Sequence, residues 1–126
     1  MKFELKKGVK ADLSNQFPIF RYADVLLMKA EAMIRQGKDA DSYVNQIRLR
    51  ANPDATPWSG VTLDQLLAER GRELFWEAHR RQDLIRFGKF NQAWWEKPLE
   101  TDTKSNTFPV PEWVIESNPN VELDPV

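Results

Sequence analysis

Apolar residues recur with helical spacing in two long stretches of the chain, and neither stretch contains a proline. The eight prolines leave residues 19–52 and 58–97 uninterrupted, and proline breaks helix interiors. The first stretch opens with an amphipathic segment over residues 21–36, whose apolar face is formed by Tyr22, Val25, Leu26, Met33 and Ile34. This i, i+3, i+4 pattern predicts an α-helix over residues 21–36.

A second helix is predicted directly after the first. Gly37 ends the first pattern, as glycine commonly does just beyond a helix. Asp39 is a suitable N-cap for a second amphipathic segment over residues 40–50. A turn this short places consecutive helices side by side in antiparallel directions, so the sequence predicts a helical hairpin.

The second stretch predicts another pair of helices. Thr62 and Gln65 match a capping box, in which each side chain bonds the backbone amide of the other residue. Apolar residues then follow helical spacing over residues 63–87, but the phase shifts and predicts a bend or break at residues 78–80. Gly71 lies inside the apolar face, where glycine costs about 1 kcal/mol against alanine, and we expect another helix to approach closely there.

Beyond residue 88 the pattern weakens. One or two further helical turns are predicted around the aromatic residues Phe90, Trp94 and Trp95. Residues 97–126 are mostly loop by composition, with a short helix that starts at Pro111 and ends near Ser117, because proline suits the first position of a helix.

These elements predict an all-α fold. The two hairpins begin about 41 residues apart, and two stacked helical hairpins of this size are similar in shape to a tetratricopeptide-like array. We predict antiparallel helical hairpins with an irregular C-terminal tail, forming a single domain over residues 1–126. Residues 1–16 are a poorly defined lead-in, where a short strand or plain coil is compatible with the sequence.

Composition excludes several kinds of site and partner. The chain has no cysteine and one histidine, so disulfides, thiolate zinc sites and multi-histidine metal sites are excluded. A formal net charge of −1 argues against nucleic acid as a partner. No apolar run reaches the roughly 18 residues that a membrane-spanning helix needs, so we expect this chain itself to be soluble. No cofactor is predicted.

Residues 69–86 form the most densely charged segment. Three glutamates lie four residues apart on one helix face, with arginines interleaved: Glu69, Glu73 and Glu77 with Arg70, Arg72, Arg80, Arg81 and Arg86. Two such carboxylates could serve a glycosidase, and His79 with Asp83 could be a base and its orienting acid. Neighbouring arginines favour ionised carboxylates, however, whereas a general acid must hold its proton. We therefore predict that these charges brace adjacent helices and that the chain is not an enzyme, with Glu73 paired to Arg48 or Arg50.

The five tryptophans divide into two groups. Trp58 and Trp76 lie in or beside predicted helices, which indicates core positions. Trp94, Trp95 and Trp113 come late in the chain, where they could close the edge of the core, contact a protein or stack on a sugar. These last three are the candidate ligand-binding residues.

Four segments in order resemble the C-terminal region of the SusD/RagB family. They are FPIFRYADVLLMKAEAMIRQG at 17–37, VNQIRLRAN at 44–52, ERGRELFWEAHRRQDLIRFGKF at 69–90 and FPVPEWVIESNPN at 108–120. The resemblance assigns a structural motif made of Arg21, Glu31, Arg48, Arg50, Glu69, Glu73, Glu77, His79, Arg80, Asp83 and Arg86. It also implies an all-α, tetratricopeptide-like scaffold.

The resemblance further implies a function. SusD/RagB proteins are lipid-anchored at the outer membrane of Bacteroidetes, where they sit on a SusC-type TonB-dependent transporter and help to capture glycans or other nutrients. They bind and do not catalyse. Family members are several times longer and carry a signal peptide and a lipidated cysteine, so we expect this chain to be a piece of a longer protein or a truncated reading frame.

Some positions depart from the family pattern. Ala78 stands where glycine is usual, Gly71 where arginine is frequent and Phe87 where tryptophan is frequent. Glycan-contacting aromatic residues of the family generally come from regions upstream of the matched segments. We therefore expect this chain to bind oligosaccharide weakly or not at all, and to self-associate through apolar area that the longer protein covers. A free-standing helical module for protein–protein interaction is the alternative function.

Overall fold

A computed structural model describes residues 18–118 and residue 120. The chain divides into two compact units, Met1–Arg80 and Arg81–Val126, and each is described by itself. The predicted lead-in over residues 1–16 lies outside the described residues. The prediction of a single domain stays a prediction.

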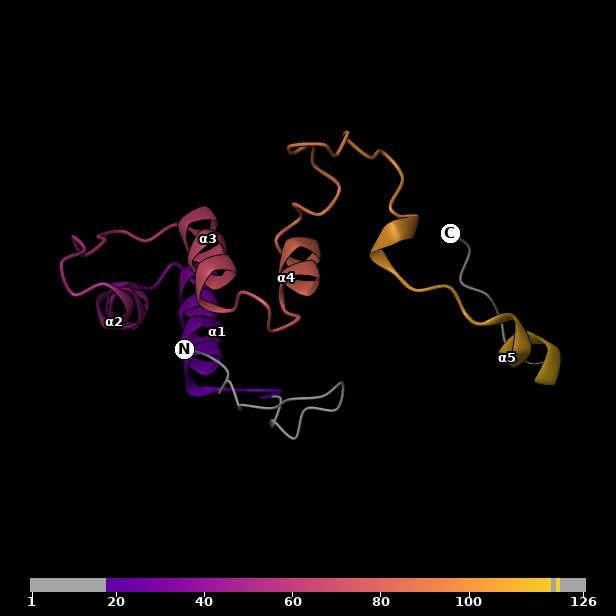
Figure 1. The fold of residues 1–126 in the computed structure, drawn as a ribbon, viewed down its shortest axis with the longest axis horizontal. Coiled ribbons are helices and arrows are strands. Elements are labelled where there is room, and N and C mark those ends of the chain that lie inside the picture. Colours follow the sequence, from indigo (N-terminus) through magenta and orange to yellow (C-terminus); the bar gives the residue numbers. More distant parts are fainter. Residues whose placement is uncertain (1–17, 119, 121–126) are drawn as a thin grey trace, which may run out of the picture. The chain divides into compact units, whose positions relative to one another are not determined.

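Helices are the only regular elements in the described part of the chain, so the predicted all-α class is confirmed. The helices are α1 (Tyr22–Arg35), α2 (Asp41–Ala51), α3 (Leu63–Glu73), α4 (Arg80–Arg86), the 3-10 helix η1 (Lys104–Asn106) and α5 (Glu112–Ser117). Figure 1 shows α1, α2 and α3 gathered in the first unit.

The first unit is built around α1, which contacts both α2 and α3. Its core consists of short and branched aliphatic side chains from these three helices and the loops that join them: Ala23, Leu26, Leu27, Ala30, Ala40, Val44, Ile47, Val61, Leu66, Leu67 and Leu74. Gly37 has a φ of 69°, as expected of a residue just beyond a helix C-terminus. The observed ends of α1 and α2 lie within about one residue of the ends predicted from the spacing of apolar residues.

The two predicted N-caps have different outcomes. Thr62 accepts a hydrogen bond from the Gln65 amide, and the Gln65 side chain bonds the Thr62 amide, so the capping box is confirmed. The assignment of Asp39 is wrong, because Ala40 occupies the N-cap position of α2. The Asp39 carboxylate instead accepts from the Asp41 amide at 3.0 Å, which forms a turn one residue earlier.

The break in the second predicted pair begins earlier than its expected position at residues 78–80. The helix α3 ends at Glu73, and positive φ values of 63° at Trp76 and 62° at Ala78 direct the connection to α4. Trp76 is 79% exposed, so its assignment to the core is wrong. The approach expected at Gly71 comes from a side chain rather than from helix backbone, since a Cβ there would lie 2.8 Å from Nη1 of Arg80.

The second unit holds most of α4, the 3-10 helix η1, α5 and several turns. The helical turns predicted around residues 90–95 are wrong: Trp94 and Lys97 form an isolated antiparallel bridge instead. The short C-terminal helix is confirmed as α5, although Pro111 is its N-cap rather than its first residue.

Candidate functional site

Arg21 joins the start of α1 to the end of α3. Its Nη1 donates to Oε1 of Glu73 at 2.6 Å, and its Nη2 donates to the Glu73 carbonyl at 2.5 Å. Its Nε and Nη2 donate to the two carboxylate oxygens of Glu77 at 2.5 and 3.0 Å. This fork-to-fork pairing with Glu77 fixes both distance and orientation, so Arg21 acts as a clamp between the two segments.

Glu73 also forms an ion pair with a second arginine. Nη2 of Arg50, in the last turn of α2, lies 2.6 Å from the same Oε1 that Arg21 contacts. Glu73 therefore joins α2, α3 and the start of α1. Burial by itself lowers the pKa of Arg21, but hydrogen bonds to Glu77 and Glu73 outweigh that effect and raise it. Of the two predicted partners of Glu73, the structure pairs it with Arg50.

A second pair lies deeper between α1 and α3. Nη2 of Arg70 contacts Oδ1 of Asp24 at 2.9 Å, and each side chain is 3% exposed. Asp24 is not among the site residues predicted from the sequence. Its position beside the apolar face of an amphipathic helix was the available signal, because a carboxylate there is buried and requires a partner.

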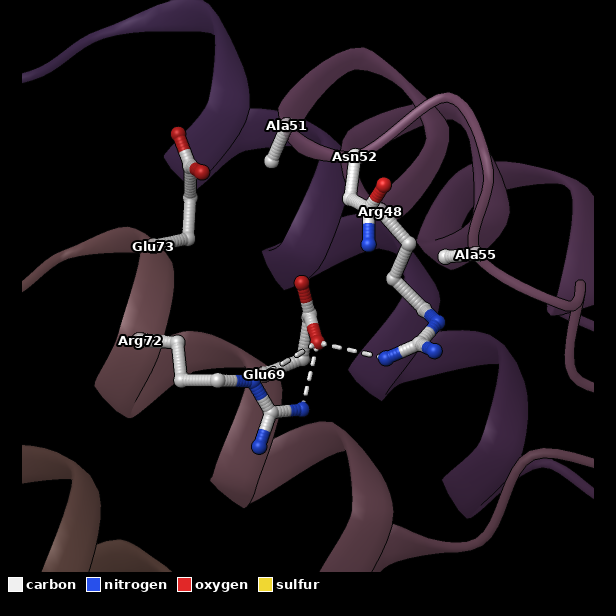
Figure 2. Close-up of a pocket in the computed structure, with 7 residues that line it drawn as sticks. All are labelled: Arg48, Ala51, Asn52, Ala55, Glu69, Arg72 and Glu73. Carbon is white, nitrogen blue, oxygen red and sulfur yellow. Dashed lines mark hydrogen bonds and ion pairs between the residues drawn. The ribbon is translucent and has the colours of Figure 1, made fainter.

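A third cluster surrounds Glu69 on α3. Its Oε2 accepts from Nη1 of Arg48 at 3.3 Å and from Nη2 of Arg72 at 2.5 Å, as the dashed lines in Figure 2 show. The Arg48 guanidinium also lies 3.6 Å from the centre of the Trp58 ring, a cation–π stack. A pocket of about 270 Å³ opens here, lined by Arg48, Ala51, Asn52, Ala55, Glu69, Arg72 and Glu73.

The loop before α3 is held by side chains of α2. The side-chain nitrogen of Asn45 donates to the backbone carbonyl of Trp58 at 2.7 Å. The side-chain oxygen of Asn45 accepts from the backbone N–H of Trp58 at 2.8 Å. The Asp41 carboxylate accepts from the amides of Gly60 and Val61 at 2.7 and 2.8 Å. Hydrogen bonds from Val61 and Gly60 lower the pKa of Asp41. These contacts place Trp58 against Arg48.

The remaining charged residues of the predicted motif make more local contacts. Glu31 pairs with Arg35 one turn later at 3.0 Å. Arg80 donates to the Leu67 carbonyl at 3.0 Å. In the second unit, buried Asp83 pairs with Arg86 of the same helix at 2.7 Å. His79 lies half-buried in the connection between α3 and α4.

The three candidate ligand-binding tryptophans are exposed in the second unit. Trp94, Trp95 and Trp113 are 46%, 87% and 69% exposed. Nζ of Lys97 lies 4.8 Å from the centre of the Trp94 ring, and the same lysine pairs with Glu100 at 3.1 Å. Hydrogen bonds from Lys97 and Ser105 lower the pKa of Glu100. The role of the three tryptophans in ligand binding stays a prediction.

The arrangement of the first unit is suited to holding helices together. Arginine and carboxylate groups from separate segments pair with one another in all three clusters. Within residues 18–118, no group of three or more His, Cys, Asp or Glu residues could hold a metal ion. None of the described helices has the length and apolar character needed to cross a membrane.

Comparison with known proteins identifies relatives of the chain. The sequence model of the SusD family matches residues 5–124. The starch-binding protein SusD of Bacteroides thetaiotaomicron is 37% identical over 112 residues, which cover 82% of this chain and 20% of that protein. SusD-like protein P25 of Formosa agariphila is 42% identical over 78 residues, covering 56% of this chain and 15% of that protein.

A solved structure also matches the chain. NanU of B. fragilis matches with a TM-score of 0.67 and 27% identity, over 86% of this chain and 26% of that one. The chain therefore spans about a fifth to a quarter of the length of SusD and NanU.

Proposed function

Because the chain belongs to the SusD family, we propose that it is the C-terminal scaffold part of a SusD-like protein that binds glycans or other nutrients. In this proposal the longer protein is lipid-anchored at the outer membrane and works with a SusC-type TonB-dependent transporter. The chain contributes structure and protein contacts rather than catalysis. The SusD family consists of binding proteins, which supports a role without chemistry.

The pairing of Arg21 with Glu73 and Glu77 carries the scaffold proposal. Glu73 and Glu77 were considered for chemistry because they lie in one densely charged segment. They contact Arg21 at the start of α1 instead, with Arg50 joining from α2. Charges committed to such pairs stabilise one arrangement of helices and leave few groups to act on a substrate.

A glycan site within this chain would have to use exposed aromatic residues, since sugar rings present apolar faces that stack on them. Trp94 and Trp95 are the candidates for such a site, together with Trp113. Titration calorimetry with a panel of plant and host glycans tests this point. We expect no micromolar binding by the chain. Micromolar binding that is lost in Trp94→Ala or Trp95→Ala would contradict the scaffold proposal.

The transporter partnership is tested in the longer protein encoded by the same reading frame. A tagged version should copurify an outer-membrane TonB-dependent transporter and bind a glycan. A protein that does neither would contradict the proposal. Glu73→Ala serves as the matched variant, because loss of the scaffold should reduce both properties together.

A protein-interaction module is the second candidate, and exposed aromatic residues of the first unit favour it. Phe75 and Trp76 are 62% and 79% exposed, and apolar side chains gathered at a surface mark contact sites. The genomic context separates the two candidates. A frame that extends to a signal peptide and lipidated cysteine beside a transporter gene supports the scaffold; a complete short frame supports the module.

A further inference from the structure

The pocket beside Glu69 has hydrogen-bonding capacity that the ion pairs of the first unit do not use. It lies wholly within that unit, between the end of α2 and the second half of α3. Its volume is about 270 Å³, close to the lower end of the range of roughly 300–1,000 Å³ that is typical of small-molecule sites. A space of this size suits one small chemical group.

The pocket offers one acceptor from α3. Oε2 of Glu69 already accepts from both Arg48 and Arg72. The other carboxylate oxygen, Oε1, points into the pocket (Figure 2) and has no hydrogen-bond partner in the described part of the chain. Glu69 is only 4% exposed, so water has little access to this oxygen. A ligand that donates a hydrogen bond to Oε1 is therefore favoured.

The pocket also offers one donor from the end of α2. Asn52 directly follows the last residue of that helix, and its Oδ1 accepts from the Asp54 amide at 3.1 Å. This bond fixes which side of the Asn52 amide group is oxygen, so the nitrogen Nδ2 faces the pocket, as Figure 2 shows. Among the described residues Nδ2 has no hydrogen-bond partner. A donor and an acceptor thus face the same space from neighbouring walls.

The charges around the pocket favour a neutral ligand. Its lining contains two guanidinium groups, from Arg48 and Arg72, and two carboxylates, from Glu69 and Glu73. An anion would meet the open oxygen of Glu69, and a cation would meet the N–H groups of Asn52 and the arginines. Repulsion of this kind is stronger in a partly buried site than in water. A neutral group that both accepts and donates avoids both penalties.

The apolar part of the lining narrows the choice to a flat group. The methyl groups of Ala51 and Ala55 line the pocket, and no aromatic side chain is among its lining residues. Sugar rings bind by stacking on aromatic faces, so this lining disfavours a sugar. A carboxamide is flat and neutral, and it carries an acceptor oxygen and a donor nitrogen on adjacent positions.

We propose that this pocket binds a primary carboxamide group. The carboxamide oxygen accepts from Nδ2 of Asn52, the carboxamide nitrogen donates to Oε1 of Glu69, and the flat face packs on the methyl groups of Ala51 and Ala55. Glutamine and asparagine carry this group, either as free amino acids or within a peptide. The site goes beyond the proposed scaffold function and does not depend on it.

A titration followed by nuclear magnetic resonance tests the proposal. Four probes of similar size are compared: propionamide, propionate, propylammonium and propylene glycol. Binding to the isotopically labelled chain is read from the side-chain NH₂ signals of Asn52. We expect propionamide to shift these signals with a dissociation constant of about 1–10 mM, as for a very small ligand. The other three probes should bind at least about tenfold more weakly. The absence of a saturable shift, or equally tight binding of another probe, would overturn the proposal.

Asn52→Asp changes the group that faces the pocket and little else. The aspartate still accepts from the Asp54 amide, but an acceptor replaces the donor that faces the ligand. We expect propionamide to bind about tenfold more weakly and propylammonium to become the tighter ligand. Asn118→Asp, outside the helices of the second unit, is the matched control and should change neither. An unchanged preference in Asn52→Asp would overturn the proposal. Where backbone signals show that this variant is unfolded, Ala51→Leu replaces it and should abolish propionamide binding by filling the pocket.

Two further probes distinguish the source of the carboxamide. Free glutamine and a short end-capped peptide with a central glutamine present the same group. Tighter binding of free glutamine than of the peptide indicates a small nutrient, and the reverse order indicates a peptide ligand; both results support the site. Failure of both probes to displace propionamide would overturn it. None of these measurements involves the transporter or a glycan, so this inference and the proposed function can fail separately.

Discussion

Arg21 and Glu73 lie 52 residues apart in the sequence, and their side chains meet at 2.6 Å between the start of α1 and the end of α3. The same arginine reaches the Glu73 carbonyl, so it binds both the side chain and the backbone of one residue. The pair therefore fixes the end of α3 as well as the packing of the two helices.

Glu73→Ala should destabilise the first unit by about 3 kcal/mol. Removing one partner of a buried ion pair costs about this much: Glu73 is 7% exposed, and its loss removes one of the two carboxylates that Arg21 contacts. Urea unfolding followed by circular dichroism measures the loss. Arg50→Ala is the control: that side chain is 60% exposed, so its removal should cost under about 1 kcal/mol. Equal losses for both variants would contradict the prediction.

Ala78→Gly should stabilise the protein by about 1 kcal/mol. Ala78 has a φ of 62°, which costs an L-residue roughly 1–2 kcal/mol and costs glycine little. The matched control is Ala68→Gly inside α3, which should destabilise by about 1 kcal/mol because glycine disfavours helix. Thermal unfolding distinguishes the two signs. A destabilised Ala78→Gly protein would show that the strain is absent.

Gly71 and Arg80 should be coupled in a double-mutant cycle. A Cβ at residue 71 would meet the Arg80 guanidinium and displace its hydrogen bond to the Leu67 carbonyl. In an Arg80→Ala background, Gly71→Ala should therefore stabilise by about 1 kcal/mol, the helix preference of alanine. With Arg80 present the gain should be smaller or reversed. Identical effects in both backgrounds, measured by urea unfolding, would remove the coupling.

Asp41 should make folding sensitive to acid. Its pKa is lower in the folded protein than the ordinary value of 3.8, so its stabilising contribution is complete above about pH 4. That contribution is lost as pH falls through the folded pKa. Asp41→Asn should therefore lose less stability than wild type between pH 6 and pH 3. Urea midpoints at the two pH values provide the comparison, and equal losses would contradict the prediction.

Sequence reasoning succeeded where the determinant is local. The capping box at Thr62 and Gln65 needs residues only three apart, and the apolar period of α1 lies within one helix. The end of α3 is different. Helical apolar spacing continues past Glu73, and the turn depends on positive φ at Trp76 and Ala78. Neither residue type favours that conformation, so the shift in apolar phase predicted a break at residues 78–80 but not the end of α3 at Glu73.

The partners of the charged residues could not be predicted from local sequence either. Their density predicted ion pairs between helices, but the choice of partners depends on contacts 46–56 residues apart, such as Asp24 with Arg70 and Arg21 with Glu77. The same arginines and carboxylates could pair with one another in many different combinations. Only the relative placement of the helices selects among them, and that placement follows from packing of the aliphatic core.

The position of Arg21 sets an order of events during synthesis on the ribosome. Residues 21 and 77 are separated by 56 positions, which take roughly 3–11 seconds to add at about 5–20 residues per second. During that interval α1 and then α2 can be completed before the first carboxylate partner of Arg21, Glu73, is added 52 positions after it. The nascent hairpin therefore passes through a period in which Arg21 has neither carboxylate partner, and the contacts of Arg21 are complete only after Glu77 has been added.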